Sequence, residues 1–231
     1  MSVSFKQKLY DEFTQYLTDE RRERFEKNAY ERTRYVTVVL EDVYQEHNIS
    51  AVLRTCDCFG VQNVHIIEDK HQYRANEAIS KGASQWLSLT RYSKPEQSTA
   101  ECFAALRAQG YTIVAATPHE QDTLIDALPL DSKIAVVFGT ERWGLSSYAL
   151  ENADKFVKIP LYGFTESFNI SVSAAIALYE LTQRLRQSSV SWRLSPDELI
   201  DLKLSWLGRV THRTHQLKER LLENSVSCFF E

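Results

Sequence analysis

The feature that most constrains the fold is a series of short apolar runs that alternate with helix-like segments through the middle of the chain. The runs are "RYVTVVL", "VHII", "WLSL", "YTIVAAT", "IAVVFG" and "KFVKIP". Runs that are apolar at consecutive positions are typical of strands covered by helices on both faces of a parallel sheet. The intervening segments "NISAVLRTCDCFG" and "PEQSTAECFAALRAQG" end at Gly60 and Gly110, as helices often do. The sequence therefore predicts an α/β fold with a doubly wound parallel sheet.

Helical extensions are predicted at both ends of this core. Residues 3–33 place apolar side chains at helical spacing, and Ser195 followed by Glu198 is a capping-box signal for a final helix that runs to about Asn224. We expect three parts: an N-terminal helical extension at 1–34, the main domain at 35–187 and a C-terminal helical extension at 188–231.

Charge is distributed unevenly, although the net charge is only -4. Residues 35–182 hold 11 Lys or Arg against 18 Asp or Glu, whereas the two ends together hold 16 against 13. Residues 203–220 contain five basic residues, one Glu and two histidines. A polyanion would therefore meet the ends of the chain first. The solvated face of an amphipathic helix explains the same charges equally well.

Composition and segment lengths exclude several classes. The start has no hydrophobic signal region, and no apolar run is long enough to cross a bilayer, so we expect a cytoplasmic protein without membrane contact. The four cysteines form no CxxC pair and have no His-rich partner segment, which argues against a disulfide framework or a metal site. We expect buried thiols at Cys56, Cys58, Cys102 and Cys228.

Three loops that follow predicted strands carry polar residues where ligands bind in such folds, beyond the carboxyl ends of the strands. In the first loop Asn48 is suited to cap the next helix, and Arg54 follows among apolar neighbours. A guanidinium in such surroundings needs an acceptor. A structural ion pair with Asp57 or Glu141 is the alternative to a catalytic role.

The second loop is "FGTERWGLS". Gly139 at the end of a buried strand suggests close approach of the backbone to a ligand or to another turn, and Gly144 permits a second bend. Glu141 and Arg142 lie between the two glycines. The spacing is not that of a phosphate-binding loop. An ordinary turn with an ion pair is the alternative.

The third loop, within "IPLYGFTESFNISVSAAIALYE", crowds polar side chains before a helix rich in small residues. Capping by Asn169 or Ser171 accounts for one or two of them. The excess indicates a ligand pocket or a polar dimer seam. The polar residues are Thr165, Ser167, Asn169, Ser171 and Ser173.

Together these loops resemble the three motifs of the SpoU/TrmH family of RNA ribose methyltransferases, within the SPOUT superfamily. The resemblance covers about residues 35–186 and is closest to the tRNA-modifying branch. It implies a SPOUT-type parallel sheet with a C-terminal trefoil knot, a homodimer, S-adenosylmethionine as cofactor and tRNA as partner. Sequence pattern alone does not suggest a knot, because knots are close to absent among folds.

The resemblance also implies roles for individual residues. The positions that hold the methyl donor are matched by Thr117, Gly139, Ile159 and Phe168. The active-site positions are matched by Asn48, Arg54, Glu141, Ser167 and Asn169. Arg54 matches the residue assigned to activating the ribose 2'-hydroxyl. Since a guanidinium is a poor base, we expect it to bind the adjacent phosphate and hydroxyl and to stabilise the developing alkoxide.

Two of the motifs depart from the common family pattern. Thr140-Glu141-Arg142 stands where Asn-Glu-Gly is common, and Phe168 stands where Leu is common. Arg142 adds positive charge near the site.

The implied function is a tRNA guanosine 2'-O-methyltransferase that acts on guanosine 18 of the D loop. The expected RNA contacts in the basic C-terminal segment are Arg209, Arg213 and Lys218. Alternatives are a 2'-O-methyltransferase for ribosomal RNA and a non-catalytic RNA-binding homologue. A nucleotide-dependent oxidoreductase is disfavoured because the chain has no GxGxxG turn.

Overall fold

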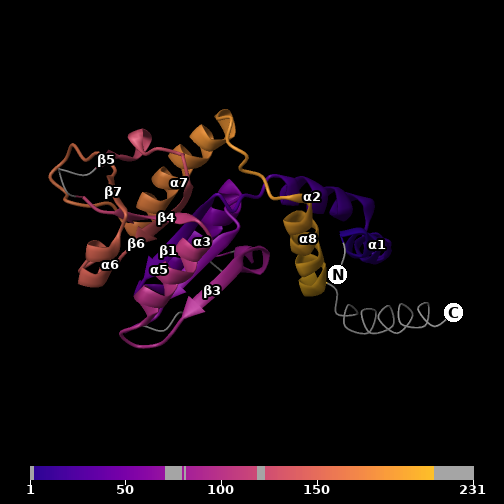
Figure 1. Cartoon of the computed structure of the whole chain (residues 1–231), viewed down its shortest axis with the longest axis horizontal. Helices are drawn as coiled ribbons and strands as arrows, with labels where there is room; N and C mark the ends of the chain where they lie inside the picture. The colour runs from indigo at the N-terminus through magenta and orange to yellow at the C-terminus, as the bar shows by residue number, and fades with distance from the viewer. Residues whose placement is uncertain (1–2, 71–79, 81, 119–122, 211–231) are drawn as a thin grey trace. The chain divides into compact units, whose positions relative to one another are not determined.

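The structure is a computed structural model that describes residues 3–70, 80, 82–118 and 123–210 (Figure 1). Contacts divide the chain into two compact units. One unit is formed by the described residues of Met1–Arg32 and Arg193–Glu231, and the other by those of Thr33–Trp192.

The unit Thr33–Trp192 is built on a seven-stranded sheet in which every pair of neighbours is parallel, in the order β3-β2-β1-β6-β4-β7-β5. The predicted α/β class with a parallel sheet is thereby confirmed. The two-residue strand β5 was not predicted, because both of its residues are exposed and form no apolar run. The strands are β1 (Val36–Glu41), β2 (Asn63–Ile67), β3 (Ser88–Tyr92), β4 (Tyr111–Ala116), β5 (Thr123–Leu124), β6 (Lys133–Phe138) and β7 (Lys155–Lys158).

Helices cover both faces of this sheet. On one face α3 (Glu46–Phe59) and α7 (Ile170–Gln187) pack side by side, and on the other lie α5 (Ser98–Ala108) and α6 (Ser147–Asn152) (Figure 1). Successive strand residues point to opposite layers. Val38 of β1 packs in the α3/α7 layer and Val39 in the α5/α6 layer, and both are fully buried. Each such side chain contributes roughly 1.5–3 kcal/mol by leaving water. Two 3-10 turns, η1 (Ala83–Trp86) and η2 (Ile125–Ala127), also lie among the described residues of this unit.

The ends of the helices fix where the loops begin. Gly60 closes α3 with φ +75°, as its position predicts, and Gly110 with φ +81° follows α5. Asn169 caps α7 by accepting a hydrogen bond from the Ser171 backbone N–H at 2.9 Å. The prediction that Asn48 caps α3 is wrong, because the helix begins at Glu46 and its N-cap residue is Gln45, three residues before Asn48. Asn48 therefore lies inside the first turn.

The other unit contains α1 (Val3–Thr14), α2 (Asp19–Tyr30) and α8 (Pro196–Val210). The segment expected to be helical at 3–33 is two helices, because Thr18 starts a new one by accepting from the Arg21 N–H. The capping box is confirmed: the Ser195 N–H donates to Glu198 Oε2 at 2.9 Å, and the Glu198 N–H to Ser195 Oγ at 3.3 Å. The predicted end near Asn224 lies outside the described residues.

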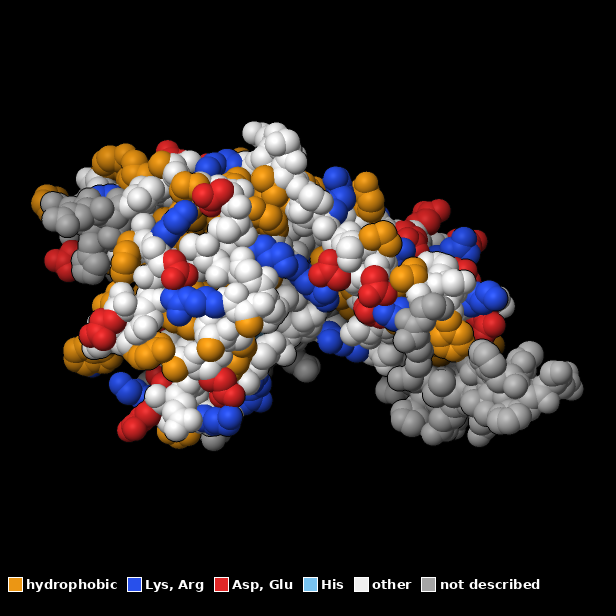
Figure 2. Space-filling model, in the orientation of Figure 1, with side chains coloured by type: hydrophobic (Ala, Val, Ile, Leu, Met, Phe, Trp, Pro, Cys, Tyr) orange, Lys and Arg blue, Asp and Glu red, His pale blue; other side chains and the backbone are white. Residues whose placement is uncertain are grey.

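Three further expectations concern cysteines, membranes and surface charge. Cys56 and Cys102 are buried as predicted, whereas Cys58 is exposed because a two-residue step on α3 turns it away from the core. Cys228 lies outside the described residues. In the part of the chain that the structure describes, no helix is long and apolar enough to cross a membrane. On the face shown in Figure 2, acidic and basic side chains of the described residues are interspersed.

Candidate functional site

A cavity of about 360 Å³ opens where β4, β6 and β7 end at their carboxyl sides. Its lining comes from the segments that follow these three strands and from the first turns of α7. The sequence-predicted cofactor residues Thr117, Gly139, Ile159 and Phe168 all line it. Glu141 and Ser167, two of the predicted catalytic residues, line it as well. The chain thus brings six predicted residues from three loops to one cavity.

The turn after β6 forms one wall and is tightly closed. The Thr140 N–H donates to the Gly144 carbonyl at 2.9 Å, and the Gly144 N–H donates back to the Thr140 carbonyl at 3.0 Å. A Cβ on Gly139 would lie 2.3 Å from the Gly144 carbonyl carbon and oxygen. The close approach of the backbone predicted at Gly139 is therefore observed, and its partner is Gly144 of the same turn. Gly144 has φ +68°, which only glycine adopts without strain.

Asn48 joins the three motifs through its side-chain amide. It is 2% exposed, and its Nδ2 group donates to a carboxylate oxygen of Glu141 and, at 3.0 Å, to Gln45 Oε1. Its Oδ1 atom accepts from Asn169 Nδ2 at 3.0 Å. Three predicted catalytic residues that are far apart in sequence therefore form one hydrogen-bonded group.

Asn169 has two functions in this group. Its Oδ1 atom accepts from the Ser171 N–H at 2.9 Å and from the Ser171 hydroxyl at 2.6 Å, while its amide donates to Asn48. The start of α7 is thereby tied to the first turn of α3. Capping and coupling between the helices account for two of the polar side chains crowded into this loop.

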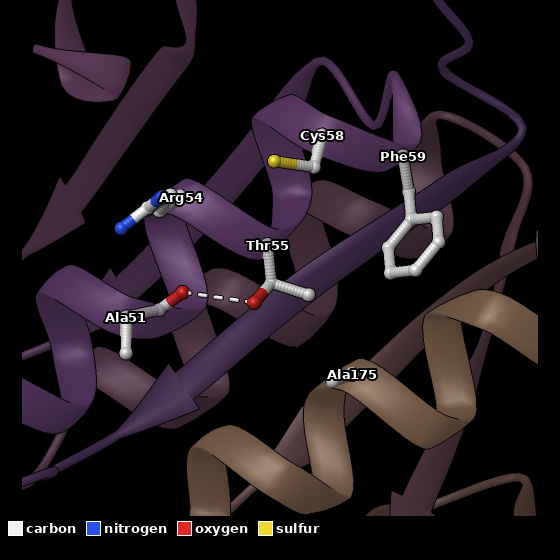
Figure 3. Close-up of a pocket in the computed structure, with 6 residues that line it drawn as sticks. All are labelled: Ala51, Arg54, Thr55, Cys58, Phe59 and Ala175. Atoms are coloured by element: carbon white, nitrogen blue, oxygen red, sulfur yellow. Dashed lines mark hydrogen bonds between the residues drawn. The ribbon is translucent and has the colours of Figure 1, made fainter. Parts of the chain in front are cut away.

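Arg54 stands apart from the other predicted residues. Six residues after Asn48, it is turned about 120° around the helix axis. It lines a second cavity of about 280 Å³ between α3 and α7, and in Figure 3 its guanidinium extends away from Ala175 of α7. The other lining residues are Ala51, Thr55, Cys58 and Phe59.

Two expectations for Arg54 require correction. The side chain is exposed rather than held among apolar neighbours. It forms no hydrogen bond or ion pair with any residue that the structure describes, so the alternative pairing with Asp57 or Glu141 is wrong. Glu141 contacts Asn48 instead. The guanidinium is therefore available to a ligand from outside this chain.

Sequence reasoning missed three residues of the site. Gln45 accepts a hydrogen bond from Asn48. Its role could have been predicted only if the start of α3 had been located correctly, because Gln45 is the N-cap residue of that helix. Glu166 and Trp143 line the first cavity. A large aromatic side chain in a polar, glycine-bounded loop was the available signal for Trp143.

The lining of the first cavity fits a nucleoside-bearing cofactor. Apolar side chains from Ile125, Val157, Leu161 and Phe168 offer a slot for a flat ring, and the glycine-bounded turn brings backbone groups to its edge. The volume falls within the roughly 300–1,000 Å³ typical of small-molecule sites. No group of three or more potential metal ligands occurs among the described residues.

The predicted RNA contacts are placed only in part. Arg209 is exposed near the end of α8. Arg213 and Lys218 lie outside the described residues.

Comparisons with known proteins identify a family and several relatives. Residues 35–179 match the model of the SpoU rRNA Methylase family. A tRNA (guanosine(18)-2'-O)-methyltransferase of Borreliella burgdorferi is 39% identical over 91% of this chain and 94% of its own. An enzyme of the same name from Thermus thermophilus is 34% identical over 83% of this chain and 98% of its own.

Solved structures show the same fold. The TrmH/SpoU tRNA modifying enzyme of A. aeolicus superposes with a TM-score of 0.72 at 29% identity, over 82% of this chain and 96% of that one. The SpoU methyltransferase AviRb of Streptomyces viridochromogenes, solved with the cofactor AdoMet, gives a TM-score of 0.60 at 20% identity, over 68% of this chain and 63% of that one. The second likeness concerns the fold alone.

Proposed function

The chain belongs to the SpoU rRNA methylase family, and we propose that it transfers a methyl group from S-adenosylmethionine to the ribose 2'-hydroxyl of guanosine 18 in tRNA. The observation that carries the proposal is the group Asn48, Glu141 and Asn169 beside a cavity lined by all four predicted cofactor residues. The names of the relatives from Borreliella and Thermus support the substrate.

The cavity residues would hold the cofactor. Backbone groups near Thr117 and Gly139 would bind its polar edges, and Ile159 and Phe168 would contact its ring; all four residues line the cavity. When bound, the cofactor supplies an electrophilic methyl group. The work left to the protein is alignment of the ribose hydroxyl with that methyl group and exclusion of competing water.

Asn48, Glu141 and Asn169 keep the three loops in one arrangement. Because each amide of the group is already hydrogen-bonded, the walls of the cavity need little reorganisation when substrate arrives. Ser167 lines the cavity, two residues before Asn169, and would contact the ribose.

Arg54 binds the hydroxyl that reacts and the adjacent phosphate. Its guanidinium stays protonated and carries five N–H donors, so it stabilises an alkoxide as the proton leaves rather than removing the proton itself. Within one chain Arg54 lines a different cavity from Glu141 and Ser167. This separation supports a homodimer in which the Arg54 of one copy serves the cavity of the other.

Further parts of the proposal are the trefoil knot, the RNA contacts and the location. The knot would involve the loop before α7 and the closed turn at residues 139–144 after β6. Arg209, together with Arg213 and Lys218, would bind tRNA phosphates. The enzyme would act in the cytoplasm, where tRNA is modified.

The direct test is methyl transfer from radiolabelled S-adenosylmethionine to unmodified tRNA transcripts, with the label mapped by nuclease digestion and mass spectrometry. We expect label on the ribose of guanosine 18. The Arg54→Ala variant should lose transfer while binding the cofactor within a few-fold of the unsubstituted protein. With unmodified ribosomal RNA assayed in parallel, label on that RNA alone would reassign the substrate, and cofactor binding without transfer to either RNA would favour the non-catalytic homologue.

A further inference from the structure

The turn after β6 carries a tryptophan that the folded chain leaves open to solvent. Trp143 is 78% exposed, whereas Trp192 and Trp206 are 7% and 2% exposed. Proteins bury most of the surface of a tryptophan, so an indole this open is informative. It offers a large flat apolar face to a partner.

This exposure belongs to a fixed turn. The backbone N–H of Trp143 donates to Thr140 Oγ1 at 3.0 Å. Two backbone hydrogen bonds between Thr140 and Gly144 close the turn that contains Trp143. Gly139 packs against Gly144 so closely that no side chain fits there. The backbone that carries the indole is therefore held in one conformation by contacts within the turn.

Arg142 lies against the same ring. Its guanidinium carbon is 4.8 Å from the centre of the Trp143 ring, a distance at which a cation is attracted to the indole face. Arg142 is exposed and forms no ion pair with any residue in the described part of the chain. The pair thus combines an open aromatic surface with a positive charge whose N–H groups remain available to an anion.

Arg142 and Trp143 are among the residues that line the cavity, together with Gly139, Glu141 and Ser167. A ribose that is methylated there must reach this cavity, and its base is attached only one bond away from the ring. Proteins that bind unpaired nucleotides commonly stack bases on aromatic side chains and bind the backbone phosphates with arginine. Arg142 and Trp143 supply these two groups at adjacent positions.

We propose that Trp143 stacks on the nucleobase of the nucleoside whose ribose is methylated, while Arg142 binds a neighbouring phosphate. The proposal rests on the proposed function and adds a contact that positions the target nucleoside. Stacking does not distinguish one base from another. The contact therefore orients the ribose, and the choice of guanine must come from other groups.

The test uses the full-length protein and two RNAs. One is an unmodified tRNA transcript, and the other carries an abasic residue with an intact 2'-hydroxyl at the target position. Trp143→Leu keeps an apolar side chain without an aromatic face, and Trp143→Phe is the matched control that keeps one. On the intact transcript, kcat/KM should fall about tenfold for Leu and less than about threefold for Phe, the range expected for one base–aromatic stack. On the abasic RNA, Trp143→Leu and the unsubstituted protein should have equal kcat/KM.

Two readouts do not depend on transfer. Binding of intact tRNA should quench the tryptophan fluorescence of the unsubstituted protein more than that of Trp143→Phe, because stacking on a base quenches indole emission. Arg142→Gln should weaken tRNA binding and reduce the slope of log affinity against log salt by about one, since one phosphate contact is lost.

Several outcomes would overturn the proposal. An equal loss by Trp143→Leu on intact and abasic RNA would show that the ring does not stack on the target base, as would equal quenching in the Phe variant. A dimer that dissociates in Trp143→Leu would assign the ring to a second copy of the chain. If Trp143→Leu lost more affinity for the cofactor than for tRNA, the ring would be assigned to the cofactor site. An unsubstituted protein that transfers no methyl group defeats the proposed function instead, and the quenching still reports whether Trp143 meets RNA.

Discussion

At the scale of single residues, one buried amide joins the three loops of the site. Asn48 donates to Glu141 and Gln45 and accepts from Asn169, so each face of its side chain has a partner. A buried polar group that loses its partner costs roughly 1–3 kcal/mol. Removal of this amide would leave Glu141 and Asn169, on two other loops, without their hydrogen bonds to Asn48. The stability of the fold is thereby coupled to the geometry of the cavity.

Replacement of Asn48 by Ala should therefore reduce both stability and turnover. We expect a loss of about 1–3 kcal/mol in the free energy of unfolding, from the unpaired groups, and on the order of 100-fold in kcat, from misplaced loops. Urea unfolding and single-turnover methyl transfer measure the two effects. Asn152→Ala is the matched control, since this half-buried side chain donates to the Tyr148 carbonyl on its own helix and to no other residue that the structure describes. A normal kcat in Asn48→Ala would refute the coupling.

His65 makes stability depend on pH. Burial lowers the pKa of its imidazole from 6.5 to about 4, and its Nδ1 atom lies 3.2 Å from the Tyr92 hydroxyl. The unfolded chain binds a proton near pH 6.5 and the folded chain does not, so the contribution is complete above that pH. It is lost as the pH falls from 6.5 towards 4, by up to about 3 kcal/mol.

The check is the free energy of unfolding of the unsubstituted protein and of His65→Phe at intervals from pH 7 to pH 4. Carboxyl groups titrate in both proteins, so the difference between the two curves isolates the imidazole. We expect the free energy of unfolding of the unsubstituted protein to fall relative to that of His65→Phe as the pH falls below 6.5. Parallel curves would mean that His65 is protonated in the folded protein as readily as in the unfolded one.

At the scale of elements, the sequence locates the loops of the site better than the contacts within it. Strands buried on both faces show as apolar runs, and parallel strands end at one edge, so the loops after β1, β6 and β7 are predicted to lie at one edge of the sheet. The cofactor positions Thr117, Gly139 and Ile159 come from the resemblance to the family, and all three line one cavity. The start of α3 was not predicted correctly, because Gln45 at its N-cap makes no side-chain capping bond that a pattern could indicate. The side on which Arg54 lies depends on helix phase and on packing with α7, which residue types alone do not specify.

The turn between β6 and α6 gives the sharpest test at this scale. Gly139→Ala would place a Cβ 2.3 Å from the Gly144 carbonyl, so the turn must open. We expect a loss of cofactor affinity of at least tenfold and a lower melting temperature, because this turn lines the cavity. Isothermal titration with S-adenosylmethionine and thermal unfolding measure the two effects. Gly208→Ala in α8 is the control, because a Cβ there meets no atom within 4 Å and alanine favours helix. Unchanged cofactor binding in Gly139→Ala would separate the turn from the cofactor site.

At the scale of the whole molecule, the division into two units separates the proposed chemistry from part of the proposed RNA contact. The sheet, both cavities and the Asn48 group belong to Thr33–Trp192. That unit also ties its own ends together, since the Thr33 hydroxyl donates to the Trp192 carbonyl at 2.7 Å and the Arg186 guanidinium lies 4.7 Å from the centre of the Trp192 ring. We therefore expect this unit to fold on its own.

A chain restricted to residues 33–192 should consequently fold cooperatively and bind S-adenosylmethionine within a few-fold of the full chain. Its affinity for tRNA should fall by at least about tenfold and depend less steeply on salt, because residues 203–220 and their five basic side chains are gone. Calorimetry with the cofactor and filter binding at two salt concentrations measure these properties. If the short chain binds tRNA with unchanged affinity and salt slope, the phosphate contacts lie on the sheet unit, and Arg142 becomes the first basic residue to substitute there.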